Sequence, residues 1–206
     1  MTEVIIAGIV LAAGTSSRMG SVNKLLLKYK NHTIIEEVLE QLSGSEVDEI
    51  LVVTGFEKHR LEELFAHRLT GRVSFVYNSN YRLGRAESIK CAVRQVKDTA
   101  DAALFMVADK PGITSTLINR AIDRYLKDRQ AILYVETPDG RGHPIIFSKE
   151  LFGDLLLLKG DCVGDELVAK YKADLITLKD DAQQIDIDCE SDYRILLKNE
   201  VGKRTR

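Results

Sequence analysis

Apolar, β-branched runs alternate along the chain with longer segments in which apolar residues recur with the period of a helix. The runs are almost continuously apolar, as strands covered on both faces must be. They predict strands at residues 5–11, 49–53, 73–76, 102–107 and 131–135. The segments between and after them predict helices at residues 33–42, 57–69, 85–96 and 115–126. Thr33 with Glu36 forms a capping-box pattern, and Gly44 stands where the first helix would end.

This order predicts an α/β fold with a mostly parallel sheet and helices on both faces. Such sheets bind ligands beyond the carboxyl ends of their strands, so functional residues should follow strands directly. The alternation breaks after Val135, where turn-forming residues are frequent. The remainder predicts a turn at 138–142, a strand at 144–147, a helix from about 148, a loop at 159–161, strands at 175–178 and 184–187, and a helix from about 191. We expect one domain over residues 1–206, because no linker or repeat interrupts the pattern.

Composition narrows the class of protein. The 206 residues are 45% hydrophobic and 29% charged, which is typical of a globular domain with a substantial core. The formal net charge of -2 gives no basic excess, so we expect no nucleic-acid partner. Three widely spaced cysteines predict neither a disulfide framework nor a metal motif, which favours the cytoplasm. The apolar N-terminal run lacks a basic leader and no stretch is long enough for a bilayer, so we expect no signal peptide and no membrane association.

The first motif with chemical potential directly follows the first predicted strand. It consists of Leu11, Ala12, Ala13, Gly14, Thr15, Ser16, Ser17, Arg18, Met19 and Gly20, with Lys24 after it. Small residues and glycine allow backbone amides to approach an anion closely. Arg18 offers a planar fork for phosphate oxygens and Lys24 a mobile charge, which together suit a triphosphate. The alternative is an ordinary strand-to-helix turn with two surface cations. The segment matches neither the P-loop nor the dinucleotide-binding fingerprint.

Two acidic motifs predict a metal site. Asp109 follows the predicted strand at 102–107, where a carboxylate can bind Mg²⁺ together with phosphates. The alternative is a turn or helix-capping role, because a helix follows shortly. Strand alternation places Asp186 and Asp188 on one face, so one of them, Asp188 by preference, can complete the magnesium site. The alternative for this pair is a strand end that caps the final helix.

Two weaker motifs also lie next to predicted strands. The first comprises Gly142, His143 and Pro144. Its glycine permits close contact with a ligand, and its histidine can donate a hydrogen bond to a phosphate or a ring system, although a hairpin turn with a surface histidine explains it equally well. The second comprises Asn78, Gly84 and Ser88. It predicts part of a base and ribose pocket, although the N-terminus of any helix has similar polar residues.

These motifs, in this order, resemble the molybdenum cofactor nucleotidyltransferases. The resemblance rests on Leu-Ala-Ala-Gly-x-Ser-x-Arg-Met-Gly followed by Lys, then Asp-x-Pro, Gly-His-Pro and Asp-Ile-Asp, and it covers residues 9 to about 193. The double alanine Ala12-Ala13 is similar to the cytidylyltransferase branch, since the guanylyltransferase branch usually has glycine at the second position. The resemblance implies a three-layer, Rossmann-like, glycosyltransferase-A-type fold. It also implies CTP, Mg²⁺ and a molybdopterin acceptor.

Matching the family residue by residue assigns roles to this chain. The nucleotide would be bound by Leu11, Ala12, Ala13, Gly14, Arg18, Lys24, Asn78, Gly84 and Ser88. The catalytic residues would be Arg18, Lys24 and Asp109, the metal ligands Asp109 and Asp188, and the acceptor-binding residues Gly142, His143 and Pro144. The nucleotide-binding half would then cover about residues 1–136 and the acceptor-binding half about residues 137–199.

The chain departs from the family pattern in four places. Three residues stand between Gly20 and Lys24 where the family usually has two, and the other three departures are substitutions next to Asp109, Ser88 and Asp188. The departures are Ser21-Val22-Asn23 as the spacer, Ala108 for glycine, Glu87 for a small or hydroxyl residue, and Cys189-Glu190 for Thr-Pro. They leave the reaction type intact, but they leave open the base, the acceptor and the position of Lys24.

The expected reaction is attack by the terminal phosphate of the molybdopterin cofactor on the α-phosphorus of CTP, with release of pyrophosphate. One alternative is transfer to another phosphorylated acceptor, such as a sugar or polyol phosphate, or transfer from GTP. Another is a non-catalytic carrier that delivers the cofactor to a molybdoenzyme or its maturation factor. The complete set of Arg18, Lys24 and Asp109 favours an enzyme, because a carrier would not need all three.

Overall fold

The predicted alternation of strands and helices is present in the computed structural model, which describes residues 4–20, 22–65, 71–161, 165–172, 175–182 and 184–204. The strands are β1 (Ile6–Ala12), β2 (Lys28–Tyr29), β3 (His32–Thr33), β4 (Glu49–Thr54), β5 (Val73–Tyr77), β6 (Ala102–Val107), β7 (Ile132–Thr137), β8 (Gly140–Ser148) and β9 (Leu175–Lys179). The helices are α1 (Ile34–Ser43), α2 (Lys58–Phe65), α3 (Arg85–Val96), α4 (Ser115–Asp128), α5 (Phe152–Leu155), α6 (Asp165–Lys170) and α7 (Glu190–Arg204). Among these helices, none has the combination of length and apolar character that crossing a bilayer would need.

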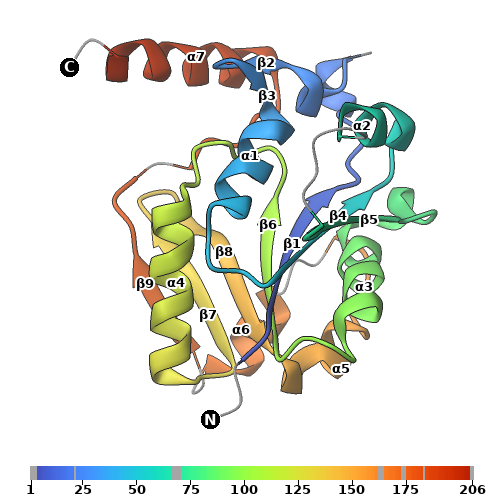
Figure 1. The fold of residues 1–206 in the computed structure, drawn as a ribbon, viewed down its shortest axis with the longest axis vertical. Coiled ribbons are helices and arrows are strands. Elements are labelled where there is room, and N and C mark those ends of the chain that lie inside the picture. Colours follow the sequence, from blue (N-terminus) through green and yellow to red (C-terminus); the bar gives the residue numbers. More distant parts are fainter. Residues whose placement is uncertain are drawn as a thin grey trace.

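Seven strands form one sheet in the order β5-β4-β1-β6-β8-β7-β9 (Figure 1). Strands β5, β4, β1 and β6 are parallel, β8 is antiparallel to both of its neighbours, and β9 is parallel to β7. The carboxyl ends of β1, β4, β5 and β6 therefore meet at one edge. Because β8 runs in the opposite direction, its first residues lie at this same edge.

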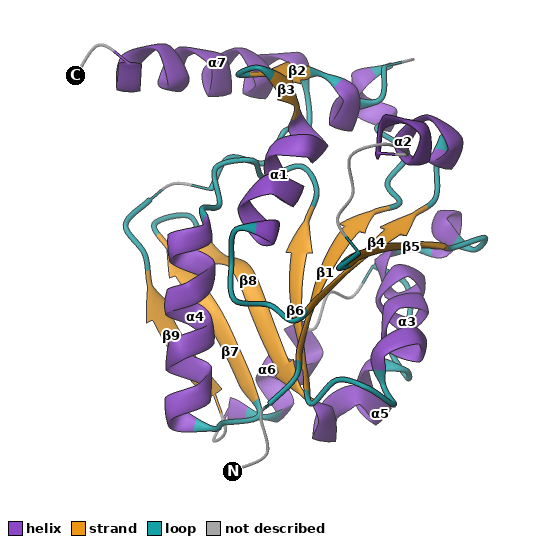
Figure 2. Cartoon of the chain, in the orientation of Figure 1, coloured by secondary structure: helices purple, strands orange, loops and turns teal. Residues whose placement is uncertain are grey.

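The two faces of the sheet are covered by different helices, as Figure 2 shows. On β1, Ile6 and Val10 pack with apolar residues of α1, α2 and α4, whereas Ala7 and Ile9 pack with those of α3, α5 and α6. This alternation follows from the two-residue period of a strand. The predicted three-layer α/β fold, with a mostly parallel sheet and helices on both faces, is confirmed.

Several boundaries differ from the prediction. Residues 184–187 form no strand; the Gln184 side chain and a single backbone hydrogen bond from Ile187 to Asp109 hold them to the rest of the chain. The helix expected from about residue 148 is a 3-10 turn, Lys149–Leu151, followed by the short α5. Helix α2 covers Lys58–Phe65, and residues 66–69 of the predicted helix lie outside the described part.

The first helix begins as predicted. The Thr33 hydroxyl accepts a hydrogen bond from the Glu36 amide, and the Glu36 carboxylate accepts one from the Thr33 amide. The preceding hairpin of β2 and β3 was not predicted, because its strands have only two residues each. This hairpin packs against α7 through a small cluster that includes Tyr29, Leu196 and Ile187. The cluster anchors the segment that contains Asp188.

Candidate active site

A cleft of about 1100 Å³ opens at the edge of the sheet where the strands end. Most residues predicted for the site line it. They are Leu11, Ala12, Ala13, Gly14, Arg18, Lys24, Gly84, Ser88, Asp109, His143 and Asp188. They come from five separate parts of the chain, and the parallel sheet brings them together because it aligns their strand ends.

The loop after β1 fixes the backbone of Lys24. Ser16 has a left-handed backbone, with φ of 53°, and its hydroxyl accepts a hydrogen bond from the Lys24 amide at 3.2 Å. The Asn23 side chain accepts one from the Leu25 amide, which starts the next 3-10 turn. Residue 21 of the spacer lies outside the described part. The backbone of Lys24 is therefore tied to the loop, and the longer spacer does not carry its side chain out of the cleft.

The charged centre of the cleft consists of two cations and two carboxylates. Lys24 Nζ lies 2.5 Å from Asp109 Oδ2 and 3.2 Å from Asp188 Oδ1. Arg18 Nη1 lies 2.9 Å from Asp188 Oδ2. The Lys24 side chain is only 13% exposed, whereas that of Arg18 is 66% exposed. Lys24 is thus the central cation, and Arg18 lies at the rim, where it can reach a ligand.

The two carboxylates fit a divalent metal ion. Asp109 follows β6 and Asp188 precedes α7, yet both direct an oxygen at the same ammonium group. Carboxylate oxygens that converge on one cation are the donors that Mg²⁺ and Mn²⁺ prefer. Asp109 and Asp188 would hold such an ion, with phosphate oxygens completing its shell.

The segment around Asp188 is held from both sides. The Ile187 amide donates a hydrogen bond to the Asp109 carbonyl at 3.3 Å, and the Ile187 side chain is fully buried. The Asp192 carboxylate accepts hydrogen bonds from the amides of Asp188 at 3.0 Å and Cys189 at 2.9 Å. Asp192 therefore caps α7 and fixes the backbone of Asp188. This role of Asp192 was not predicted, although an aspartate in the first turn of a helix is a capping signal.

Gly142 and Pro144 lie next to His143 in the chain, but they are not among the described residues that line the cleft. Both are buried, and a Cβ added to Gly142 would lie 2.7 Å from Gln184 Oε1. The Gln184 carboxamide accepts a hydrogen bond from the His143 amide at 2.8 Å and donates one to its carbonyl. Gln184 thus pairs with His143 where β7 and β8 are out of register. Gln184 was not predicted as a partner of His143, although it lies two residues before Asp186 and so falls on the same face in an alternating pattern.

His143 is held as a neutral imidazole. Its Nδ1 lies 3.2 Å from the Phe105 carbonyl, which can only accept, so Nδ1 carries the proton. Burial, together with the nearby charge of Lys110, lowers the pKa of His143 to about 4. Lys110 itself pairs with Asp186 at 3.2 Å. The motif predicted that His143 can donate a hydrogen bond to a phosphate or a ring system, but with the proton on Nδ1 its Nε2 is an acceptor at neutral pH.

This environment predicts an acid-dependent loss of stability. An ordinary histidine takes up a proton below about pH 6.5, whereas folded His143 does so only below about pH 4. Between these values the unfolded chain binds more protons, so the free energy of unfolding should fall as the pH falls, by about 1–2 kcal/mol at about pH 5. Urea unfolding at about pH 7 and about pH 5 measures this loss. His143→Asn, whose amide can still donate to Phe105, should lose less; an equal loss in both proteins would contradict the assignment.

Asn78 supports the cleft from behind. It is buried, its Nδ2 donates a hydrogen bond to the Ser88 hydroxyl at 3.0 Å, and its Oδ1 accepts one from the Asn80 amide. Ser88 lines the cleft, but Asn78 is not among the described residues that do. Near Ser88, the Arg85 amide donates a hydrogen bond to Asp161 Oδ1 at 3.2 Å. Asp161 therefore caps the N-terminus of α3 from a distant loop, which sequence spacing alone does not reveal.

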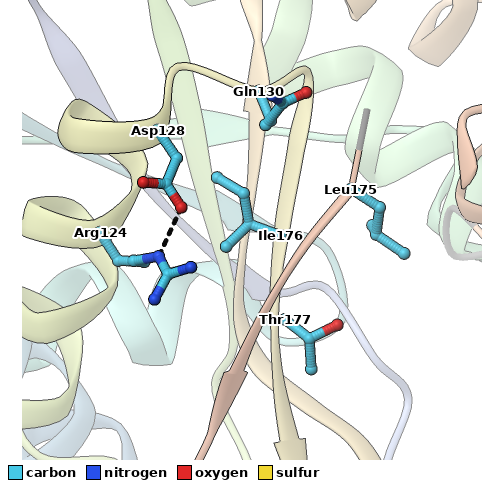
Figure 3. Close-up of a pocket in the computed structure, with 6 residues that line it drawn as sticks. All are labelled: Arg124, Asp128, Gln130, Leu175, Ile176 and Thr177. Carbon is cyan, nitrogen blue, oxygen red and sulfur yellow. Dashed lines mark hydrogen bonds and ion pairs between the residues drawn. The ribbon is translucent and has the colours of Figure 1, made fainter. Parts of the chain in front are cut away.

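A second hollow, of about 450 Å³, lies between the end of α4 and the edge strand β9 (Figure 3). Arg124 and Asp128 line it and pair with each other at 2.6 Å within the same helix. Leu175, Ile176 and Thr177 of β9 form its other side. Among the described residues, none of those predicted for the site lines this hollow, so we assign the chemistry to the larger cleft.

Comparison with known proteins places this geometry in a family. Residues 8–175 match the family described as MobA-like NTP transferase domain. The bifunctional protein GlmU of Staphylococcus carnosus (strain TM300) is 30% identical over 146 residues, which are 69% of this chain and 31% of that protein. The chain therefore spans about a third of the length of the curated relatives that it matches.

Solved structures agree with this placement. Rv0371c from Mycobacterium tuberculosis H37Rv superposes with a TM-score of 0.81 at 29% identity, over 96% of this chain and 100% of that one. Rv0371c in complex with manganese gives a TM-score of 0.78 at 28% identity, over 94% and 98%. A nucleotidyl transferase from Methanothermobacter thermautotroptrophicus has the same fold, with a TM-score of 0.82 at 23% identity, over 98% and 99%. The Rossmann-like, glycosyltransferase-A-type fold is confirmed, and the chain belongs to the MobA-like NTP transferase family.

Proposed function

We propose that this chain transfers CMP from CTP to the terminal phosphate of the molybdopterin cofactor and releases pyrophosphate. Membership of the MobA-like NTP transferase family supports nucleotidyl transfer. The double alanine Ala12-Ala13 supports CTP, and the Gly-His-Pro motif supports the pterin acceptor, both through the resemblance of the sequence motifs. In this proposal residues 1–136 bind the nucleotide and residues 137–199 bind the acceptor. The product would pass, in the cytoplasm, to a molybdoenzyme or its maturation factor.

The charged centre is the observation on which the proposal rests. Lys24 Nζ lies within 3.2 Å of a carboxylate oxygen of both Asp109 and Asp188, at the end of the sheet next to the loop that follows β1. A carrier that only bound a pterin would need neither paired carboxylates nor two cations beside them. Transfer of a nucleotidyl group needs both, because a triphosphate and its metal ion must be held while negative charge moves to the leaving pyrophosphate.

The residues of the cleft can perform this reaction without a side-chain base. A terminal phosphate oxygen is already ionised, so catalysis depends on positioning and on neutralisation of charge. Backbone amides near Gly14 and the guanidinium of Arg18 would bind the triphosphate and stabilise the leaving pyrophosphate. Asp109 and Asp188 would hold a divalent ion, which supplies a Lewis acid to the phosphate oxygens.

Further cations line the cleft beside His143. They are Lys110, Arg85 and Arg141, and Lys110 pairs with Asp186, which also lines the cleft. The cations suit a phosphorylated acceptor, whichever molecule has the phosphate. Neutral His143 offers Nε2 as an acceptor, which suits the amide and amino N–H groups of a pterin better than a phosphate oxygen. The hydroxyl groups of a sugar phosphate can donate to Nε2 as well, so the choice of the pterin rests on the resemblance of the Gly-His-Pro motif.

A pyrophosphate-release screen tests the proposal. CTP, GTP, UTP and ATP would each be supplied with Mg²⁺ and with molybdopterin cofactor, a sugar phosphate or a polyol phosphate. We expect release with CTP and the pterin, at least about tenfold faster than with any other pair, since single contacts of this kind are worth about 1–3 kcal/mol. If pyrophosphate release were fastest with a sugar or polyol phosphate, that phosphate would take the place of the pterin as the proposed acceptor. Binding of the pterin without release from any nucleotide would favour the carrier.

A further inference from the structure

Lys24 occupies the position between the two carboxylates that a metal ion would need. Its Nζ lies 2.5 Å from Asp109 Oδ2 and 3.2 Å from Asp188 Oδ1, and its side chain is 13% exposed. Asp109 and Asp188 have exposed fractions of 21% and 34%. The ammonium group is therefore part-buried between them and is not a loose surface charge.

A divalent ion and the Lys24 ammonium cannot occupy this position together. An Mg²⁺ ion held by the same two oxygens, at the usual distance of about 2.0–2.1 Å from each, would lie in the space that Nζ fills. Charge opposes it as well. Asp109 and Asp188 contribute two negative charges, and Lys24 and Arg18 contribute two positive charges, so the centre is formally neutral. A divalent cation gains little from a neutral site.

We propose that Lys24 is an internal counter-ion that keeps the metal ion out of the carboxylate pair until a nucleotide triphosphate draws the lysine away. Metal ion and nucleotide then enter the cleft together, and each raises the affinity for the other. This inference rests on the proposed function, since it takes a triphosphate as the new partner of Lys24. In the protein without nucleotide, Lys24 would thus prevent a divalent ion from binding to Asp109 and Asp188.

The structure allows this exchange without a change of the backbone. The Lys24 amide is held by Ser16 Oγ at 3.2 Å, and Asn23 caps the turn that begins at Lys24. The backbone is therefore fixed, while the four methylene groups of the side chain can swing. Ser16 belongs to the same loop as Gly14, where the phosphates would bind. The lysine needs to move only from the carboxylates to the neighbouring phosphate site.

Binding of Mn²⁺ alone to the full chain, without nucleotide, tests this proposal. Free Mn²⁺ would be measured by electron paramagnetic resonance during titration of the wild type and of Lys24→Met. We expect the variant to bind Mn²⁺ about tenfold more tightly or better, because it leaves two carboxylates without their shared cation. Lys90→Met is the matched control: Lys90 is 14% exposed and pairs with Glu87 outside the cleft. It should leave the affinity for Mn²⁺ unchanged.

The new binding must also be assigned to the cleft. His32, Glu37 and Glu40 bring ligand atoms within 4.8 Å of one another and offer a competing surface site for Mn²⁺. The double variant K24M/D109N separates the two sites. It should lose the gain in affinity if the ion binds in the cleft; retention of the gain would place the ion elsewhere and overturn the proposal.

Other outcomes are equally decisive. Affinity for Mn²⁺ that does not rise in Lys24→Met, or in Lys24→Gln should the first variant fail to fold, would overturn the exchange. The pyrophosphate assay is independent of this result. Release by the wild type without a gain in Lys24→Met would leave the function standing and remove the exchange. A gain in Mn²⁺ affinity in Lys24→Met, without pyrophosphate release from any nucleotide, would leave the displacement of the metal ion by Lys24 standing and remove the proposed function.

Discussion

Replacing Asp109 with asparagine is expected to lower turnover by roughly a thousandfold or more, which corresponds to about 4 kcal/mol of transition-state stabilisation. Asp109 directs Oδ2 into the charged centre, 2.5 Å from Lys24 Nζ, and Asp188 approaches the same ammonium. Asparagine keeps the shape but loses the charge, so the metal ion would keep one carboxylate in place of two. The rate of pyrophosphate release at rising Mg²⁺ concentrations measures the effect.

The fold should survive this change, because the Asp109 side chain is part of the cleft and not of the apolar core. Circular dichroism and the midpoint of thermal unfolding would check this. Asp128→Asn is the matched control, since Asp128 also pairs with a cation, Arg124, but lies at the other hollow. It should leave turnover within about twofold of the wild type. Near-normal turnover in Asp109→Asn would refute the metal assignment.

The strands and the first motif could be predicted because their signals are local. A continuous apolar run predicts a buried strand, and small residues after β1 predict an anion-binding loop, whatever lies elsewhere in the chain. The position of Lys24 could not be predicted in this way. The three-residue spacer made it the least secure member of the loop, yet the structure places it at the centre of the cleft. Its position depends on Asp109 and Asp188, which lie 85 and 164 residues away.

The segment 184–188 shows the same limit from the opposite direction. Its alternation predicted Asp186 and Asp188 on one face, and both line the cleft, but alternation alone cannot distinguish a strand from a segment that forms no backbone ladder. The distinction comes from partners such as His143 and Lys110, which are distant in sequence. Pairwise contacts of this kind leave no periodic trace in the chain.

Gly84→Ala is the substitution from which we expect the largest loss of stability. Gly84 has φ of +113°, and a Cβ there would lie 2.4 Å from the Gly160 carbonyl oxygen. The strained backbone conformation costs about 1–3 kcal/mol, and the clash with a backbone atom adds to it. We expect the free energy of unfolding in urea to fall by about 3 kcal/mol or more. Because Gly84 lines the cleft, the KM for the nucleotide should also rise.

Gly140→Ala separates the two causes. Gly140 has φ of +107°, but a Cβ there would meet no described heavy atom within 4 Å, so this variant has the strain without the clash. It should lose only about 1–2 kcal/mol. The difference between the two variants then measures how firmly the loop at Gly160 is seated against α3, where the Gly160 carbonyl accepts a hydrogen bond from the Ala86 amide at 3.0 Å. Equal losses would mean that the loop at Gly160 yields to the added Cβ without cost.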